Sequence, residues 1–322
     1  MKNKLLYKLR SGKNPKFIYY SVNALRLVIP KGIFRLRLQG KLSSLSRRKD
    51  KDYIERRVDY YNKLSGTVQL PSSAPHLSEH KMSKQKVYFF DTYQYTRWFS
   101  DQFQWGFCPG DVTFVPDYPS IVKSRPLTDD NVNSIVMKLD KVRHFIFVDD
   151  KKAFTEKKNM VIFRGKVKGK PSRKLFMEMY FHHPMCDLGD VSKNTADPAE
   201  WRTEKKTINE HLDYKFIMAL EGIDVASNLK WVMSSNSIAV MPRPTCETWF
   251  MEGTLIPNYH YIEIKPDFSD LEERLNYYIE HVDESFIRHA HEYVSQFKDK
   301  RRENLISLLV LDKYFKMTGQ KS

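Results

Sequence analysis

Residues 160–173 read MVIFRGKVKGKPSR, and this stretch decides the fold. It begins with a short apolar run, continues through two glycines set among bases, and enters a helical pattern near Ser172. A strand that passes through a glycine loop into a helix is typical of parallel α/β sheets. The same geometry suits phosphate, because glycines let the backbone approach and helix N-terminal N–H groups face the anion. The alternative is a basic surface loop, since the stretch contains neither a Walker loop nor GxGxxG.

Apolar runs and helical patterns alternate on both sides of this stretch. We expect strands at residues 86–90, 112–115, 144–148, 160–163, 214–220, 237–241 and 260–264. We expect helices at residues 172–181, 227–234, 271–281, 284–297 and 303–317. The alternation predicts an α/β fold with parallel sheets. A chain of 322 residues can form two domains, and polar residues 151–159 are a plausible linker.

Two further strand–loop units contain candidate nucleotide-binding residues. In residues 214–231 a strand is followed by a glycine turn and by Ser227 and Asn228, which either cap the next helix or touch a nucleotide. Residues 241–250, MPRPTCETWF, follow another predicted strand, and two prolines stiffen this loop. Arg243 is a candidate there, and Glu247 would accept hydrogen bonds from ribose hydroxyls. The alternative for Glu247 is a solvated or salt-bridged acid.

The candidate catalytic bases are Asp111 and Asp117, in the segment PGDVTFVPDYP at residues 109–119. We expect Asp117 just past a strand end, where α/β folds place active residues. The adjacent pair Asp149 and Asp150 also ends a predicted strand and resembles a metal-binding carboxylate pair, but adjacent acids are common on surfaces. We find no HExxH, no GxSxG and no Cys–His nucleophile pattern, and we expect no metal site.

The net charge of +15 is concentrated at one end of the chain. Residues 1–57 contain 17 Lys and Arg against three acids, whereas the other 265 residues contain 37 bases and 36 acids. Apolar residues such as Leu25, Val28 and Phe34 are interleaved with these bases. This mixture suits an anionic membrane surface, although a solvated arm or a nucleic-acid arm would have a similar composition. The neutral remainder argues against a nucleic-acid-binding protein as a whole.

Location is inferred from the cysteines and from hydropathy. The three cysteines are far apart and form no CxxC pair, so reduced thiols are the simplest interpretation. No stretch has the length and apolar character of a membrane span or of a signal peptide. We therefore expect a cytoplasmic protein, with a peripheral position at the inner membrane if the basic segment binds lipid.

Several motifs, taken in this order, resemble glycosyltransferase family 90. This family includes bacterial lipopolysaccharide A proteins, fungal capsule-associated proteins and Rumi-like O-glucosyltransferases. The matching stretches cover roughly residues 86–297, and Lys123–Pro126 indicates the bacterial branch. They are residues 110–112, 121–126, 163–165, 214–216, 226–230, 257–262 and 267–271.

The resemblance implies a GT-B architecture, in which two Rossmann-like domains face each other across a cleft. With the charge pattern it predicts four parts: a basic segment at 1–57, an acceptor-side domain at 58–155, a donor-binding domain at 156–300 and a C-terminal helix at 301–322. It also implies an inverting, metal-independent transfer from a UDP-sugar, with no cofactor, onto a glycolipid or glycan of a lipopolysaccharide, lipooligosaccharide or capsule precursor. No nucleic-acid partner is expected.

The resemblance also assigns roles to single residues. Eukaryotic members use the Asp of an Arg-Asp-Tyr-Pro stretch as the base. Here Pro116 stands in place of that arginine, before Asp117, and this departure keeps Asp111 as a rival. Arg164, Gly165 and Arg173 match the donor-phosphate loop, and Ser227 matches a donor-binding turn. Lys230 is the candidate substitute for the arginine that follows this turn in the family, although lysine lacks the planar fork.

An inverting transfer needs a carboxylate to take the acceptor proton and cations to stabilise the departing diphosphate. Asp117 would supply the first, and Arg164 and Arg173 the second. The alternative function is a non-catalytic protein of the same fold that binds glycans or nucleic acid.

Overall fold

The computed structural model describes residues 12–193, 196–281 and 284–320, which form two compact units. The sheet unit contains Arg143–Pro244 and Thr254–Gln296, together with the described residues before Pro15. The helical unit contains Pro15–Val142, Thr245–Gly253 and the chain from Phe297 onward. Each unit combines segments that are far apart in the sequence, whereas the domain limits predicted near residues 58, 156 and 301 divide the chain into consecutive parts. Those domain limits remain a prediction.

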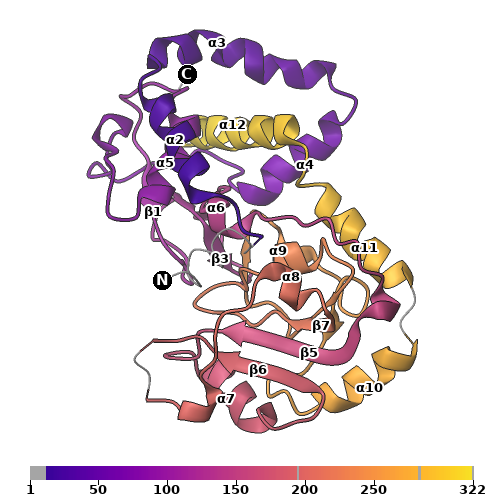
Figure 1. Ribbon diagram of the computed structural model, residues 1–322. Helices are drawn as coiled ribbons and strands as arrows, with labels where there is room; N and C mark the ends of the chain where they lie inside the picture. The colour runs from indigo at the N-terminus through magenta and orange to yellow at the C-terminus, as the bar shows by residue number, and fades with distance from the viewer. Residues whose placement is uncertain (1–11, 194–195, 282–283, 321–322) are drawn as a thin grey trace. The chain divides into compact units, whose positions relative to one another are not determined.

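A five-stranded parallel sheet, in the order β10-β8-β7-β5-β6, forms the centre of the sheet unit. Figure 1 labels β5, β6 and β7 of this sheet. Its strands are β5 (Lys158–Gly165), β6 (Cys186–Asp190), β7 (Tyr214–Met218), β8 (Ile238–Met241) and β10 (Ile262–Glu263). All residues of β7 and β8 are buried, as expected for a parallel sheet that is covered on both faces. The predicted parallel α/β class is confirmed, as are the strands expected near 160, 214, 237 and 260.

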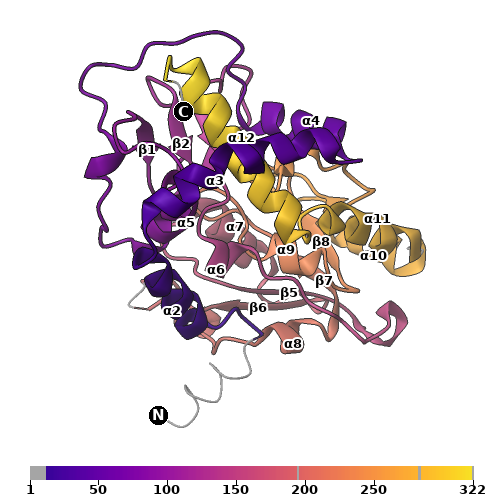
Figure 2. The same cartoon turned by 90° about the horizontal axis from the view of Figure 1, so that it is seen from above.

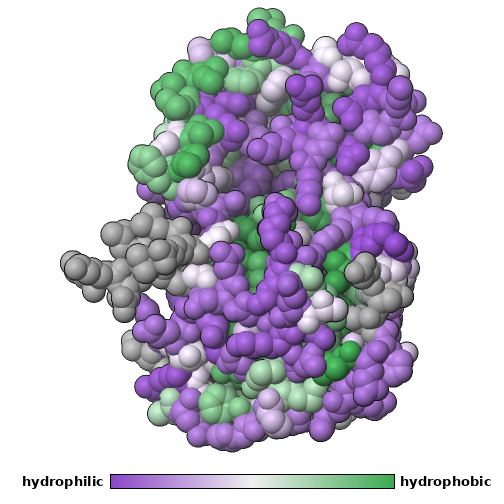
Figure 3. Space-filling view, turned by 45° about the vertical axis from the view of Figure 1, so that its right-hand side comes forward, coloured by the Kyte–Doolittle hydropathy of each residue, from purple (hydrophilic) through white to green (hydrophobic). Residues whose placement is uncertain are grey.

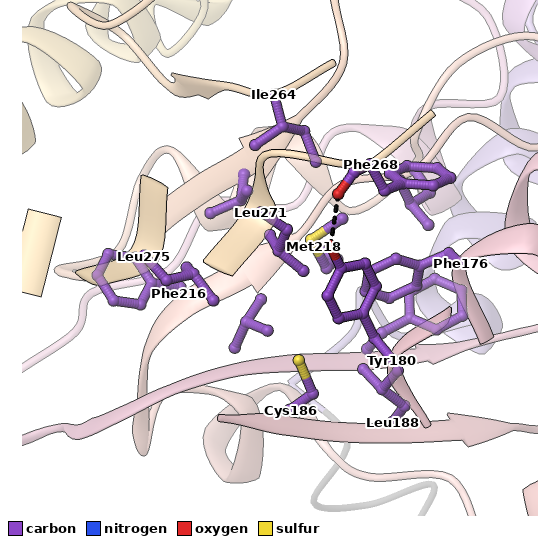
Figure 4. Packing of buried hydrophobic residues seen from close by; sticks show 14 of the residues in the cluster. Phe176, Tyr180, Cys186, Leu188, Phe216, Met218, Ile264, Phe268, Leu271 and Leu275 are labelled. Carbon is purple, nitrogen blue, oxygen red and sulfur yellow. Dashed lines mark hydrogen bonds between the residues drawn. The ribbon is translucent and has the colours of Figure 1, made fainter. Parts of the chain in front are cut away.

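The helices of the sheet unit are α7 (Pro171–Tyr180), α8 (Ile208–His211), α9 (Leu229–Val232), α10 (Leu271–His281) and α11 (Glu284–Ser295). Short 3₁₀ turns lie at η3 (Phe154–Glu156) and η4 (Ala199–Trp201). In the core, side chains of α7 and α10 meet the strands (Figure 4). The Tyr180 hydroxyl donates to the Phe268 carbonyl at 2.6 Å, and this bond ties α7 to the turn before α10.

The helical unit contains a three-stranded parallel sheet in the order β1-β2-β4 and an antiparallel pair, β3 with β9. Its strands are β1 (Gly106–Cys108), β2 (Ser120–Val122), β3 (Ser124–Pro126), β4 (Ser134–Val136) and β9 (Cys246–Thr248). Its helices include α2 (Lys16–Leu27), α3 (Lys31–Ser43), α4 (Lys51–Tyr61), α5 (Lys86–Thr96) and α12 (Lys300–Met317). Helix α12 packs against α3, α4 and α5 (Figure 2). Short helical turns complete the described chain at η1 (Ser44–Arg47), η2 (Leu77–Glu79), α6 (Lys141–His144) and η5 (Glu252–Thr254).

Three predicted strands are wrong. Residues 86–90 begin helix α5, which buries aromatic side chains on several sides and therefore shows no helical period. Residues 112–115 form an irregular loop, and residues 145–148 follow the end of α6 without forming a strand. The predicted helix at 271–281 is confirmed to the residue. The helix expected at 227–234 is real but shorter.

The basic segment 1–57 is partly core rather than a free arm. Ile54 and Arg57 of α4 are buried, and so are Leu38 and Leu42 of α3. Residues 1–11 lie outside the described part of the chain.

Candidate active site

The loop after β5 is held at the carboxyl edge of the five-stranded sheet. The Val167 backbone N–H donates to Asp190 Oδ1 and to Ser192 Oγ, each at 3.0 Å, so the exit of β5 is joined to the exit of β6. Gly165 is required locally, because a Cβ there would lie 2.4 Å from Cζ of the Phe163 ring. Helix α7 then begins with Pro171 in its first turn. This is the strand–loop–helix geometry that residues 160–173 predict.

Arg173, in the first turn of α7, joins two of these loops. Its guanidinium donates to the carbonyls of Lys166 (3.0 Å), Leu220 (2.7 Å) and Glu221 (3.0 Å). Burial, and to a smaller extent the charge of Arg143, lower its pKa to about 10. The carbonyls orient the cation but do not neutralise it. Its positive charge therefore stays at the carboxyl edge of β5 and β7.

Lysines add to this charge. The pKa of Lys205 is lowered by burial and then by Lys13, Lys166 and Lys193. Lys166 follows β5, and Lys193 and Lys205 follow β6, so we name these three lysines with Arg173 the basic edge. Gathered cations of this kind raise the local concentration of anions, and the N-terminus of α7 adds backbone N–H groups. The basic edge is therefore suited to a diphosphate.

Arg164 is bound by residues of the sheet unit itself. Its guanidinium forms an ion pair with Asp187 and donates to the carbonyls of Phe163 (2.9 Å) and Asp187 (2.7 Å). Although burial opposes ionisation of Asp187, hydrogen bonds from Tyr214 and Arg164 lower its pKa. Arg164 thus holds β5 to β6. Arg173 is the arginine of the motif whose hydrogen bonds, among the described residues, go only to backbone carbonyls.

The turn after β7 contains Ser227, Asn228 and Lys230. The Asn228 side chain donates to the Met218 carbonyl at 2.9 Å and fixes the end of β7. Ser227 is half-buried at the start of the turn. Lys230 lies on α9 with 0% of its surface exposed, so it does not face solvent in place of the family's arginine.

Arg243 and Glu247 differ from the sequence expectation. The Arg243 side chain is largely exposed and pairs with Glu263 at 2.9 Å. Glu247 lies on β9 directly opposite Arg125 of β3 and is 1% exposed. One of its oxygens accepts from Arg125 Nε at 2.8 Å, and the other accepts from the Tyr60 hydroxyl. Its carboxylate oxygens are thus occupied within the helical unit, which agrees with the salt-bridged alternative rather than with ribose binding.

The two candidate bases have different environments. Asp111 follows β1 at the carboxyl edge of the three-stranded sheet and forms an ion pair with Lys123, whose side chain is 1% exposed. Asp117 is exposed, and its carboxylate has no ion pair or hydrogen bond in residues 12–193, 196–281 and 284–320. Asn133 Nδ2 holds the loop by donating to the carbonyls of Pro116 (3.0 Å) and Asp117 (3.1 Å).

The position of Asp117 was predicted wrongly. No strand covers 112–115, and Asp117 stands just before β2, at the amino end of that strand. Tyr118 accordingly lies against Gly106, the first residue of β1. Position therefore favours Asp111, whereas availability favours Asp117, because the Asp111 carboxylate is already in contact with Lys123.

Comparison with known proteins decides the family. Residues 127–318 match the family described as Glycosyl transferase family 90. The chain is also 39% identical over 267 residues to an "O-glucosyltransferase LpsA" from Dichelobacter nodosus, over 82% of this chain and 83% of that relative. The chain belongs to glycosyltransferase family 90. Glycosyltransferase activity follows from this membership.

The family match spans only part of the candidate site. It includes the basic edge, with Arg164, Arg173 and Ser227, but begins after Asp111 and Asp117. The assignment of the base therefore depends on the Asp-Tyr-Pro resemblance and on the local environments.

Several residues of the candidate site could not be predicted from the sequence. Asp190, the last residue of β6, and Ser192, just after it, accept hydrogen bonds from the loop that follows β5, but β6 reads CDLGD and shows no apolar run. Lys193 and Lys205 join the basic edge only through the packing of distant loops. Asp149 and Asp150, by contrast, do not act as a pair, because Asp149 contacts Lys151 and the buried Asp150 contacts Lys157 at 2.8 Å. No helix in the described residues is long and apolar enough to cross a membrane.

Proposed function

We propose that this family 90 chain transfers a sugar from a UDP-sugar to a hydroxyl of a lipopolysaccharide, lipooligosaccharide or capsule precursor, with inversion at the anomeric carbon. Two observations support the proposal: the similarity to a relative named as an O-glucosyltransferase and the basic edge of the sheet unit. The second supports a nucleoside diphosphate-sugar as the donor, because concentrated positive charge at the end of a parallel sheet suits a diphosphate.

The donor diphosphate would bind at the basic edge. Arg173 is already oriented by three carbonyls, so it loses little freedom when an anion arrives. Preorganised cations of this kind stabilise charge that develops in the transition state without having to reorient. The N-terminus of α7 would face the same phosphates.

Transfer would proceed in one displacement. The acceptor oxygen attacks the anomeric carbon while Asp117 takes the proton of that hydroxyl. The bond between the anomeric carbon and the diphosphate oxygen breaks, and its electron pair leaves with UDP. A single displacement inverts the configuration, and the basic edge stabilises the charge on the leaving group. The two units, each with a parallel sheet, would correspond to the two domains of a GT-B enzyme, and we place the reaction in the cytoplasm.

Replacing Arg173 by alanine is expected to weaken UDP binding by about 1.5–3 kcal/mol, the usual contribution of a charge-assisted hydrogen bond. Titration calorimetry with UDP measures this effect. Arg288→Ala is the matched control, since Arg288 is an exposed arginine of the same unit, 65% accessible and paired only with Glu292 in the described chain.

The two variants must first show similar unfolding transitions, because Arg173 also joins two loops. Arg173→Lys then separates the roles, since lysine keeps the charge and loses the fork. If folded Arg173→Ala binds UDP like Arg288→Ala, the basic edge is not the diphosphate site.

Turnover is expected to be unchanged by EDTA and by Asp149→Asn. The basic edge supplies the positive charge that a divalent cation provides in other transferases. Asp150 belongs to a buried ion pair, so Asp150→Asn is expected to affect stability more than catalysis. Initial rates with EDTA and with added Mg²⁺ or Mn²⁺ test this expectation. A strict requirement for an added metal would contradict it.

A further inference from the structure

Helix α2 is packed with its polar face inward. Tyr19, Asn23 and Arg26 are spaced by four and three residues, so they share one face of the helix. The Tyr19 hydroxyl donates to Asp91 Oδ1 of α5 at 2.7 Å, and Arg26 Nη1 donates to Gln94 Oε1 at 3.0 Å. Asn23 is 3% exposed. The contacts that hold α2 to the helical unit are thus largely polar.

The neighbouring face of α2, about 100° around the helix axis, is apolar and exposed. Ile18, Val22 and Leu25 follow the same helical spacing and are 59%, 42% and 66% exposed. Exposure continues along the chain into α3. Nine large apolar residues between 17 and 36 are exposed, out of nineteen such residues in the described chain: Phe17, Ile18, Val22, Leu25, Leu27, Val28, Ile29, Ile33 and Leu36.

We name these nine residues the apolar ridge. A space-filling view shows hydrophobic atoms gathered at the upper left, beside hydrophilic ones (Figure 3). A soluble helix normally turns its apolar stripe toward a core. Exposed apolar surface that is concentrated in one segment marks an interaction site rather than ordinary surface composition.

The positive charge next to the apolar ridge indicates what kind of partner this surface binds. Residues 1–49 contain 14 Lys and Arg and no acid. Lys16 and Arg37 are exposed on the two ridge helices and have no ion pair within the described ranges, whereas Lys31 and Arg35 pair with Asp101. Apolar side chains flanked by unneutralised bases are the composition of helices that lie in the surface of an anionic bilayer.

Other possible binding partners fit the apolar ridge less well than an anionic bilayer does. A second copy of the chain, packed ridge to ridge, would bring two sets of bases together, and like charges at an interface oppose association. Nucleic acid would be attracted by the bases but would gain little from exposed leucine and valine. An anionic lipid surface matches both the charge and the apolar side chains.

We propose that α2 and α3 form a membrane-docking surface, in which the apolar ridge enters the interfacial region of an anionic bilayer and Lys16 and Arg37 contact lipid phosphates. Docking of this kind would bring the helical unit to the surface where a lipid-linked acceptor resides. The surface is independent of the donor site, so failure of this inference would leave the proposed sugar transfer intact.

Deleting residues 1–57 would not test the proposal cleanly, because Ile54 and Arg57 belong to the core of the helical unit. Substitutions on the ridge avoid this problem. Phe17, Leu25 and Leu36 are 82%, 66% and 89% exposed, so Phe17→Ser, Leu25→Gln and Leu36→Gln together should leave the unfolding transition nearly unchanged. Ile256→Gln with Met179→Gln is the matched control, since it removes exposed apolar side chains from the sheet unit.

The measurement is co-sedimentation of the full-length protein with vesicles of phosphatidylglycerol and phosphatidylethanolamine, compared with phosphatidylcholine vesicles. Wild type and the control pair should bind the anionic vesicles, and the ridge variant should bind at least about tenfold more weakly, since each buried methylene contributes to partition. Lys16→Gln with Arg37→Gln should weaken binding by roughly thirtyfold at low salt, from about 1 kcal/mol for each base. Lys158→Gln with Lys265→Gln is the charge control, taken from exposed lysines of the sheet unit.

Three results would overturn the proposal. The first is equal vesicle binding by the ridge variant and wild type, which would mean simple electrostatic adsorption. The second is no vesicle binding by wild type at low salt. The third is concentration-dependent dimerisation, or DNA binding, that is lost in the ridge variant while vesicle binding is retained, since a second copy or a nucleic acid would then be the occupant.

Discussion

Asp117→Asn is expected to lower turnover by about 10²–10⁴-fold while leaving UDP binding nearly intact. Asparagine has almost the same shape but cannot accept the proton of the acceptor hydroxyl. The Asp117 side chain is exposed and makes no ion pair in the described chain, so its replacement should not disturb the fold. Single-turnover rates with a saturating donor, together with UDP calorimetry, separate loss of chemistry from loss of binding.

Asp111→Asn is the matched variant. Asp111 faces the buried Lys123, so this substitution removes a negative charge from an ion pair and is expected to lower stability more than turnover. The turnover rate of each variant is therefore divided by the fraction of that variant that is folded. Near-normal turnover of Asp117→Asn, with loss of turnover in folded Asp111→Asn, would transfer the role of base to Asp111. That outcome would also agree with the position of Asp111 at the carboxyl edge of its sheet.

Glu303→Gln should destabilise the helical unit by about 3–5 kcal/mol, the usual cost of breaking a buried ion pair. Glu303 lies on α12 with a side chain 4% exposed and contacts two cations, Arg57 at 3.1 Å and Lys138 at 3.0 Å. The Trp249 indole also donates to it at 2.6 Å. Glutamine keeps the shape of the side chain but removes the negative charge that these buried cations share.

Urea unfolding measures this effect, with Asp59→Asn as the control. Asp59 lies on α4 and pairs with Lys313 at 2.7 Å, but its side chain is 70% exposed. An exposed pair contributes less than about 1 kcal/mol, so the control should unfold close to wild type. If Glu303→Gln were no less stable than Asp59→Asn, the cluster around Glu303 would not be holding α4 and α12 together.

The sequence predicted the sheet unit better than the helical unit, and the reason is physical. Strands β7 and β8 are buried on both faces, so apart from Lys215 they leave apolar runs between glycine and polar turns. The strands of the helical unit are three residues long, too short for any period to show. Helix α5 was mistaken for a strand because its aromatic residues are buried on several sides.

The sequence indicates which residues belong to the candidate site, but not which contacts those residues make. Arg173 was identified from its loop, but the carbonyls that orient it come from residues 220 and 221, which only the fold brings near. The sequence leaves Glu247 open as a ribose ligand or a salt-bridged acid. Its partner Arg125 is 122 residues away in the chain and pairs with it only through the register of β3 and β9. The polar inward face of α2 was equally hidden, since its partners belong to α5.

The most direct test of the proposed function is acceptor-dependent release of UDP. Purified full-length protein is incubated with a panel of UDP-sugars, with and without a lipooligosaccharide acceptor, and the anomeric configuration of the product is read by NMR. We expect UDP release from at least one donor, stimulated by the acceptor, with inverted configuration and with loss of the signal in Asp117→Asn. A folded protein that releases no UDP from any donor, or a product with retained configuration, would contradict it.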